Sequence, residues 1–235
     1  MRMQAAEFEE WIQSGASNFQ AVVPFDPTST VFAAVNLTVS NTDLSEPLMA
    51  DTAAFSDYMQ HFLARNGAHY GIGGYNELRT MYGRSDLFDG EEPRRLHLGL
   101  DIWGSADTPV YAPLGGVVHS FAFNDAFGDY GATIILAHQI DSGTFYSLYG
   151  HLALKDIAFL QEGAPIAAGQ LLAHFGEPHE NGHWPPHLHF QLILDMEGKK
   201  GDYPGVCKFS EREKYLQNCP DPDLFFHWMP LAIRS

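Results

Sequence analysis

From residue 96 onward the chain consists of short runs in which apolar and polar residues alternate, and this pattern constrains the fold more than any other feature. Successive side chains of a β-strand point to opposite faces, so a period of two predicts strands with one buried face. Seven strands are expected, at residues 96–103, 109–111, 116–123, 132–138, 145–151, 171–175 and 187–194. Turn-forming residues, and no helical segment, separate them. We therefore predict a mainly β fold, a compact antiparallel sheet or sandwich.

The first 95 residues have a different pattern. Apolar residues recur at three-and-four spacing in 5–14 and 51–65, which predicts two amphipathic helices, and 31–39 has the pattern of a strand. Residues 70–82 open with three glycines in five positions, without the spacing of a phosphate loop, and then have a helical pattern. We expect three parts, an α+β extension, a β domain and a loop-rich tail that packs back on the body, at residues 1–95, 96–200 and 201–235.

The charge balance excludes several classes of partner. The 235 residues include 29 acidic and 13 basic side chains, a formal net charge of −16, so no nucleic acid and no anionic membrane surface is expected as a partner. Residues 1–11 are acidic where an export signal needs an apolar run, which predicts a cytoplasmic protein. Cys207 and Cys219 are expected to be reduced thiols. The sequence carries no signal for the oligomeric state.

Nine of the twelve histidines lie between residues 97 and 189. Histidine is a common metal ligand and a common group for proton transfer. In the strand expected at 187–194, His187, His189 and Gln191 share one face, and the residues between them are apolar. The Cα atoms of residues i and i+2 of a strand lie roughly 6.6 Å apart, so both imidazoles can reach one centre. This face is therefore a candidate site.

His97 and Asp101 also share a strand face, but a straight strand would separate them by about 13 Å. The backbone must bend if they are to bind one ion, and Gly99 between them tolerates a bend. With His189 they offer two imidazoles and a carboxylate, a set found in open catalytic zinc sites and in non-haem iron sites. A further histidine, His151, ends the strand expected at 145–151.

These elements, in this order and spacing, resemble the lysostaphin-type zinc metallopeptidases, the glycyl-glycine endopeptidases that cut peptidoglycan. The similarity covers residues 96–194 and includes the stretches at 108–112, 115–118, 131–138, 144–152, 169–170 and 186–190. It implies that family's β fold, the duplicated hybrid motif, with Zn2+ as the cofactor. It also implies a metallopeptidase whose substrate is a peptidoglycan-type or small peptide conjugate, or another small amide.

Carried over by position, the resemblance makes His97, Asp101 and His189 the zinc ligands and leaves the fourth position open for water. His151 and His187 become the catalytic histidines that steady the oxyanion and move protons to the leaving amine. Two features depart from the family pattern. Gln191 stands where a glutamate is frequent, which predicts weaker orientation of a metal ligand, and the loop at 176–186 is longer.

The resemblance and the unusual loop together suggest residues that contact the substrate. Latent members of the family have an upstream asparagine in the open zinc position, and a glycine-rich turn of this chain carries an asparagine. We expect four side chains to line the cleft or bind substrate there: Trp184, His183, Tyr149 and Asn76.

A second resemblance extends beyond the β domain. Residues 73–79, 202–207 and 219–222 are similar to the metallopeptidase-like domain that some bacteria fuse to a class III aminotransferase, and this agrees with a cytoplasmic location.

Two alternative functions stay open. One is a non-haem Fe(II) oxygenase with two histidines and one carboxylate, whose usual His-x-Asp/Glu spacing differs from that of His97 and Asp101. The other is a metal-containing binding module without catalysis.

Overall fold

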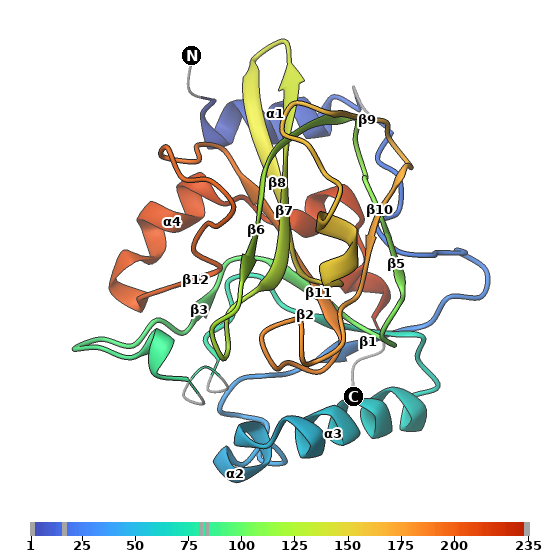
Figure 1. Cartoon of the computed structure of the whole chain (residues 1–235), viewed down its shortest axis with the longest axis vertical. Helices are drawn as coiled ribbons and strands as arrows, with labels where there is room; N and C mark the ends of the chain where they lie inside the picture. Colours follow the sequence, from blue (N-terminus) through green and yellow to red (C-terminus); the bar gives the residue numbers. More distant parts are fainter. Residues whose placement is uncertain (1–2, 16–17, 80–81, 83–84, 233–235) are drawn as a thin grey trace.

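The computed structural model describes residues 3–15, 18–79, 82 and 85–232 (Figure 1). Its centre is one mixed sheet, in which β1 and β2 pair in parallel and the remaining pairs are antiparallel. The order across the sheet is β1 (Phe32–Val35), β2 (Tyr70–Gly73), β4 (Leu100–Trp103), β11 (His187–Ile193), β8 (Gly143–Leu152), β7 (Gly131–Ile140), β6 (Gly116–Asn124) and β9 (Pro165–Ile166).

Two small antiparallel pairs complete the β structure. One joins β5 (Pro109–Tyr111) to β10 (Leu171–His174), and the other joins β3 (Leu96–His97) to β12 (Val206–Cys207). Each of the seven predicted strands has a counterpart, and the predicted mainly β fold is confirmed. The strand expected at 96–103 divides into β3 and β4, because the chain bends at Leu98 and Gly99 as the spacing required.

Helices lie outside the sheet, and α2 and α3 lie together at the lower end of the view in Figure 1. The helices predicted at 5–14 and 51–65 are confirmed as α1 and α3. Asp51 caps α3, since its side chain accepts from the backbone N–H groups of Ala53 and Ala54. The α-helices are α1 (Ala5–Gln13), α2 (Glu46–Ala50), α3 (Thr52–Arg65) and α4 (Arg212–Asn218), and the short 3-10 helices include Asp86–Phe88, Leu154–Ile157, Phe209–Glu211, Pro222–Phe225 and Met229–Leu231.

The helical pattern predicted within residues 70–82 is wrong for the residues described up to Arg79. After β2 the chain turns at Tyr75 and Asn76, where Asn76 has a φ of 57°, and then Leu78 forms an antiparallel bridge with Leu96. The backbone of Asn76 donates to His97 O, and His97 N–H donates to Glu77 O. Pairing with β3 therefore replaces the local hydrogen bonds of a helix. Residues 80–81 and 83–84 of that prediction lie outside the described residues.

One face of β11 forms part of the main hydrophobic core. Leu188, Phe190 and Leu192 are fully buried there, as the alternation predicted. Phe225, in the C-terminal part of the chain, packs against Phe190 and against Phe145 of β8. The opposite face of β11 is left for polar side chains.

Both cysteines are buried free thiols, as predicted. None of the helices in the described residues has the length and apolar character needed to cross a membrane.

Candidate metal centre

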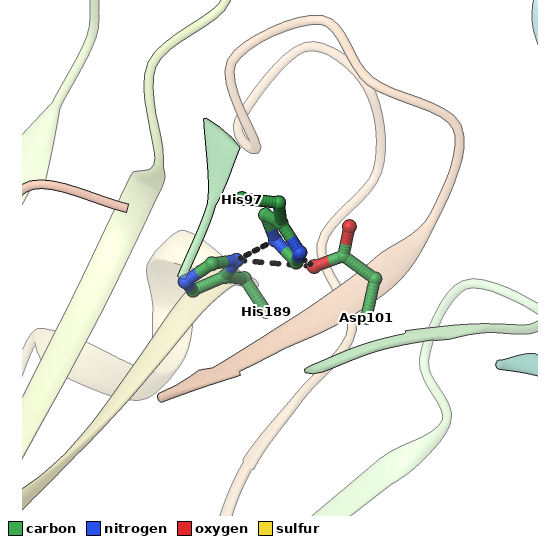
Figure 2. A group of neighbouring side chains, drawn as sticks. All are labelled: His97, Asp101 and His189. Carbon is green, nitrogen blue, oxygen red and sulfur yellow. Dashed lines mark hydrogen bonds and ion pairs between the residues drawn. The ribbon is translucent and has the colours of Figure 1, made fainter. Parts of the chain in front are cut away.

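The candidate site lies at the centre of the sheet. His189 on β11 pairs in register with Asp101 of β4 on one side and with Gly150 of β8 on the other. His97 comes from β3, just before the bend. Figure 2 shows the His97, Asp101 and His189 side chains pointing toward one another. His97 Nε2 is 3.0 Å from His189 Nδ1 and 3.2 Å from Asp101 Oδ1, and His189 Nδ1 is 3.0 Å from the same Oδ1.

Gly99 makes this convergence possible. A Cβ atom at this position would lie 2.5 Å from Cε1 and 2.6 Å from Nε2 of His189, and 2.9 Å from the carbonyl oxygen of Phe190. The imidazole therefore occupies the space that any other side chain would need. The sequence predicted that Gly99 permits a bend, and the structure adds that it admits the ring of a neighbouring strand.

The hydrogen bonds of the two histidines decide which ring nitrogens carry protons. His97 Nδ1 lies 3.0 Å from the carbonyl oxygen of Gly74, so it donates and Nε2 keeps its lone pair. His189 Nε2 lies 2.9 Å from the amide oxygen of Gln191, so it donates and Nδ1 keeps its lone pair. Two nitrogen lone pairs and the Oδ1 of Asp101 thus face one another without a proton between them.

This donor set fits a metal ion. In a tetrahedral zinc site with bonds of about 2.0–2.1 Å, the ligand atoms lie about 3.3 Å apart. The three atoms here are separated by 3.0–3.2 Å, and no other group of three potential ligand residues lies this close together in the part of the chain that the structure describes. Facing lone pairs repel in a buried site, and a cation bound among them removes that repulsion.

Gln191 holds His189 in the required tautomer. Its amide nitrogen donates to the carbonyl oxygen of Pro204 at 3.1 Å and to Sγ of Cys219 at 3.3 Å, which turns the amide oxygen toward His189. A neutral amide at this position therefore orients the ring through a 2.9 Å hydrogen bond, although it lacks the charge of a glutamate.

His151 and His187 lie beside the three converging residues, with their ring centres 4.1 Å apart. His151 Nδ1 donates to the carbonyl oxygen of Asn181 at 2.7 Å, and His187 Nδ1 donates to that of Pro185 at 2.8 Å. Among the described residues, Nε2 of each ring has no hydrogen-bond partner. The ring of Trp103 stacks on that of His187 with 3.9 Å between the ring centres, and this contact fixes the plane of the His187 ring.

Burial sets the charge state of these histidines. It lowers the pKa of His187 to about 4, and with the help of Arg79 it lowers the pKa of His97 to about 4. Burial, reinforced by His187, holds the pKa of His151 well below its ordinary value. The three rings are therefore neutral at pH 7, so each has one nitrogen that can accept a proton or bind a metal.

Arg79 is a part of this site that sequence reasoning missed. Its Nη1 donates to Oδ2 of Asp101 at 2.5 Å, and the side chain is completely buried. Burial alone would raise the pKa of Asp101, but His97 and Arg79 hold it well below its usual range. The only signal in the sequence was the position of Arg79 within the stretch 73–79, next to the glycine-rich turn.

A cavity of about 120 Å³ opens beside the centre. Asp101, His151, His187 and His189 line it together with aromatic side chains, among them Tyr82, Phe88, Tyr130 and Trp184, and with the charged side chains of Arg94, Asp129 and Asp202. Trp184 is thus placed where the sequence predicted a residue lining the cleft.

The other three predicted substrate-binding residues are not among the residues that line this cavity. Tyr149 is fully buried in the core. His183 is exposed and stacks on Phe127. Asn76 Oδ1 accepts from Nε of Arg212 at 2.9 Å. Substrate contact at these positions has no support from the geometry of the cavity.

One family model and several solved structures are similar to this chain. Residues 95–202 match the family model "Peptidase family M23". A zinc-containing peptidase from Vibrio cholerae is 25% identical over 43% of this chain and 28% of its own, with a TM-score of 0.34. A variant of the catalytic domain of the M23 protein EnpA from Enterococcus faecalis is 22% identical over 47% of this chain and 79% of its own, with a TM-score of 0.35. The catalytic domain of lysostaphin from Staphylococcus simulans is 17% identical over 68% of this chain and 96% of its own, with a TM-score of 0.40.

This chain therefore spans 28% of the length of the Vibrio peptidase. No curated protein matches it.

Proposed function

We propose that this chain is a zinc-dependent peptidase or amidase, a proposal supported by the match of residues 95–202 to the model of peptidase family M23. The observation that carries the proposal is the convergence of three unprotonated donor atoms beside two further histidines. His97 Nε2, His189 Nδ1 and Asp101 Oδ1 would hold the ion. Three protein ligands with room for a fourth are the usual arrangement of a catalytic zinc, whereas structural zinc sites have four.

The bound ion would supply two kinds of chemistry, since zinc polarises a carbonyl oxygen and lowers the pKa of water to about 7. The chain's own residues do the rest. His151 and His187 line the cavity, and because their Nδ1 atoms donate to backbone carbonyls, Nε2 is the nitrogen of each ring that is left to react. A neutral imidazole held in this way can take a proton from water and give it to the leaving amine. Once protonated, the same Nε2 can donate to the developing oxyanion.

The cavity favours a peptide or small amide as the substrate. Four aromatic residues of its lining, Tyr82, Phe88, Tyr130 and Trp184, can pack against apolar parts of a bound peptide, and the charged groups of Arg94, Asp129 and Asp202 can bind its polar parts. The formal charge of −16 weighs modestly against a polyanionic substrate. We propose a peptidoglycan-type or small peptide conjugate, and the cytoplasmic location stays a prediction.

Metal analysis and a substrate screen test the proposal. Protein purified without added metal is expected to contain about one zinc per chain, a stoichiometry that follows from a single site. The zinc-loaded protein is then assayed on muropeptides, glycyl peptides and small amides. His189→Ala is expected to abolish both metal binding and hydrolysis. His151→Ala and His187→Ala are expected to keep the zinc and lower kcat by about 10²- to 10⁴-fold.

Other outcomes would favour the alternatives. Bound iron with oxygen consumption would indicate an oxygenase, and a ligand that binds without turnover, equally well in the His151→Ala and His187→Ala variants, would indicate a binding module. Either result would contradict a zinc peptidase.

A further inference from the structure

Arg79 is the one cation that touches the proposed metal ligands among the described residues, and it comes from outside the segment that matches the peptidase family. The guanidinium is 0% exposed. Nη1 donates to Asp101 Oδ2 at 2.5 Å, Nε donates to Glu77 Oε2 at 2.6 Å, and Nη2 donates to the carbonyl oxygen of Gly74 at 3.3 Å. Nη1 also lies 3.3 Å from the hydroxyl oxygen of Tyr82. Four acceptors therefore fix its orientation.

The two carboxylate oxygens of Asp101 consequently have different partners. Oδ1 faces His97 Nε2 at 3.2 Å and His189 Nδ1 at 3.0 Å, while Oδ2 is occupied by the guanidinium. A carboxylate held by Arg79 cannot rotate to present both oxygens to the same ion without losing a buried, charge-assisted hydrogen bond.

The same segment also holds His97. The carbonyl oxygen of Gly74 accepts from His97 Nδ1, and the backbones of Asn76 and Glu77 bond to the backbone of His97 on both sides. Residues 74–79 thus contact two of the three proposed ligands. This upstream segment therefore holds the ligands in place, and Asn76 itself, expected to line the cleft or bind substrate, is bound to Arg212.

We infer that Arg79 is a positioning residue, which keeps Asp101 a ligand through one oxygen only and makes residues 74–79 an integral part of the metal centre. The inference rests on the proposed zinc site. Its chemical consequence is twofold. A one-oxygen carboxylate leaves a coordination position open for water or substrate, and a guanidinium on the other oxygen draws negative charge away from the ion, which keeps the ion a stronger electrophile.

The test uses Co2+ as a probe of coordination in the full chain. A four-coordinate Co2+ site absorbs visible light strongly, and the absorption weakens when the coordination number rises. Wild-type protein is expected to give the strong spectrum. In Arg79→Met, the released Oδ2 is expected to join the ion and weaken the bands. The zinc form is expected to lose about ten- to hundredfold in kcat with little change in KM.

Matched variants keep the test decisive. Arg65→Met, on the exposed surface of α3, removes the same charge at a residue that does not line the cavity and is expected to behave as the wild type. Arg79→Met leaves the buried Asp101 and the partly exposed Glu77 without their cation, so the double variant Arg79→Met with Glu77→Gln removes the spare charge. Arg79→Lys keeps a charge but not the planar fork, and is expected to rescue the spectrum only in part. Circular dichroism identifies the variants that fold, and any one of them suffices for the test.

A wild-type spectrum and wild-type kcat in the folded Arg79 variants would overturn the inference and leave the zinc peptidase standing. Failure of the wild-type protein to bind Co2+ or zinc would instead overturn the proposed function itself.

Discussion

Substitution of Gly99 by alanine is the sharpest test of how the site is built. The new Cβ would lie 2.5–2.6 Å from two ring atoms of His189, whereas non-bonded carbon atoms pack at about 3.5–4.0 Å. The ring must therefore retreat by about 1 Å. Because Phe190 O lies 2.9 Å away and β11 is paired on both sides, the strand cannot give way instead.

A displacement of about 1 Å is several times the tolerance of about 0.2 Å for metal–ligand distances. Gly99→Ala is therefore expected to raise the Kd for zinc at least ten- to hundredfold, equal to about 1.4–2.7 kcal/mol. Overpacking is also expected to destabilise the metal-free protein by about 1–3 kcal/mol.

Competition with a chelating dye at neutral pH measures the Kd, and urea unfolding in excess chelator measures the stability. Gly115→Ala is the matched control, because a Cβ there would meet its nearest atoms at 3.5 and 3.6 Å, which is ordinary contact. A folded Gly99→Ala protein with the zinc affinity of the wild type would refute the reasoning.

Three further predictions concern the histidines. Burial lowers the pKa of His138 to about 4. Below about pH 6.5 the unfolded chain therefore binds a proton at this residue that the folded chain does not. This difference lowers the free energy of unfolding by about 2 kcal/mol between pH 7 and pH 5. His138→Gln should remove this contribution, so the free energy of unfolding measured with urea should fall less between pH 7 and pH 5 than it does in the wild type. An equal fall in both proteins would contradict the prediction. Gln191→Leu leaves the Nε2–H group of His189 without its 2.9 Å acceptor, and should raise the zinc Kd about ten- to hundredfold in the dye assay. Zinc at 100 times its Kd should raise the free energy of unfolding by about 2.7 kcal/mol, and a His189→Ala protein that gained as much would show that the ion binds elsewhere.

Much of the fold could be predicted because its signals are local. The period of two in β11 placed His187 and His189 on the face opposite the buried Phe190, and the position of Gly99 predicted the bend between β3 and β4. These features depend on neighbours within a few residues, which a single sequence displays.

Features that depend on distant pairing were missed. Residues 76–79 have a helical pattern, but hydrogen bonds to β3 and its neighbour Arg95, about twenty residues later, hold them in a turn and a short bridge instead. Arg79 could not be assigned to the site, because its contact with Asp101 exists only once that pairing brings the two together. For the same reason Asn76 was expected in the cleft, whereas it is bound to Arg212 from the far end of the chain.

The unequal anchoring of the two histidine ligands has a kinetic consequence. His189 lies in a seven-residue strand of the main sheet, which can open only when the sheet itself opens. His97 lies in the two-residue strand β3, whose neighbours are the two-residue strand β12 and the short stretch 76–78. Short elements open locally at far lower free energy than central strands. We therefore expect amide hydrogen exchange to be much faster at His97 than at His189. A bound ion would leave by way of β3, at a rate set by local opening and well above the rate of global unfolding.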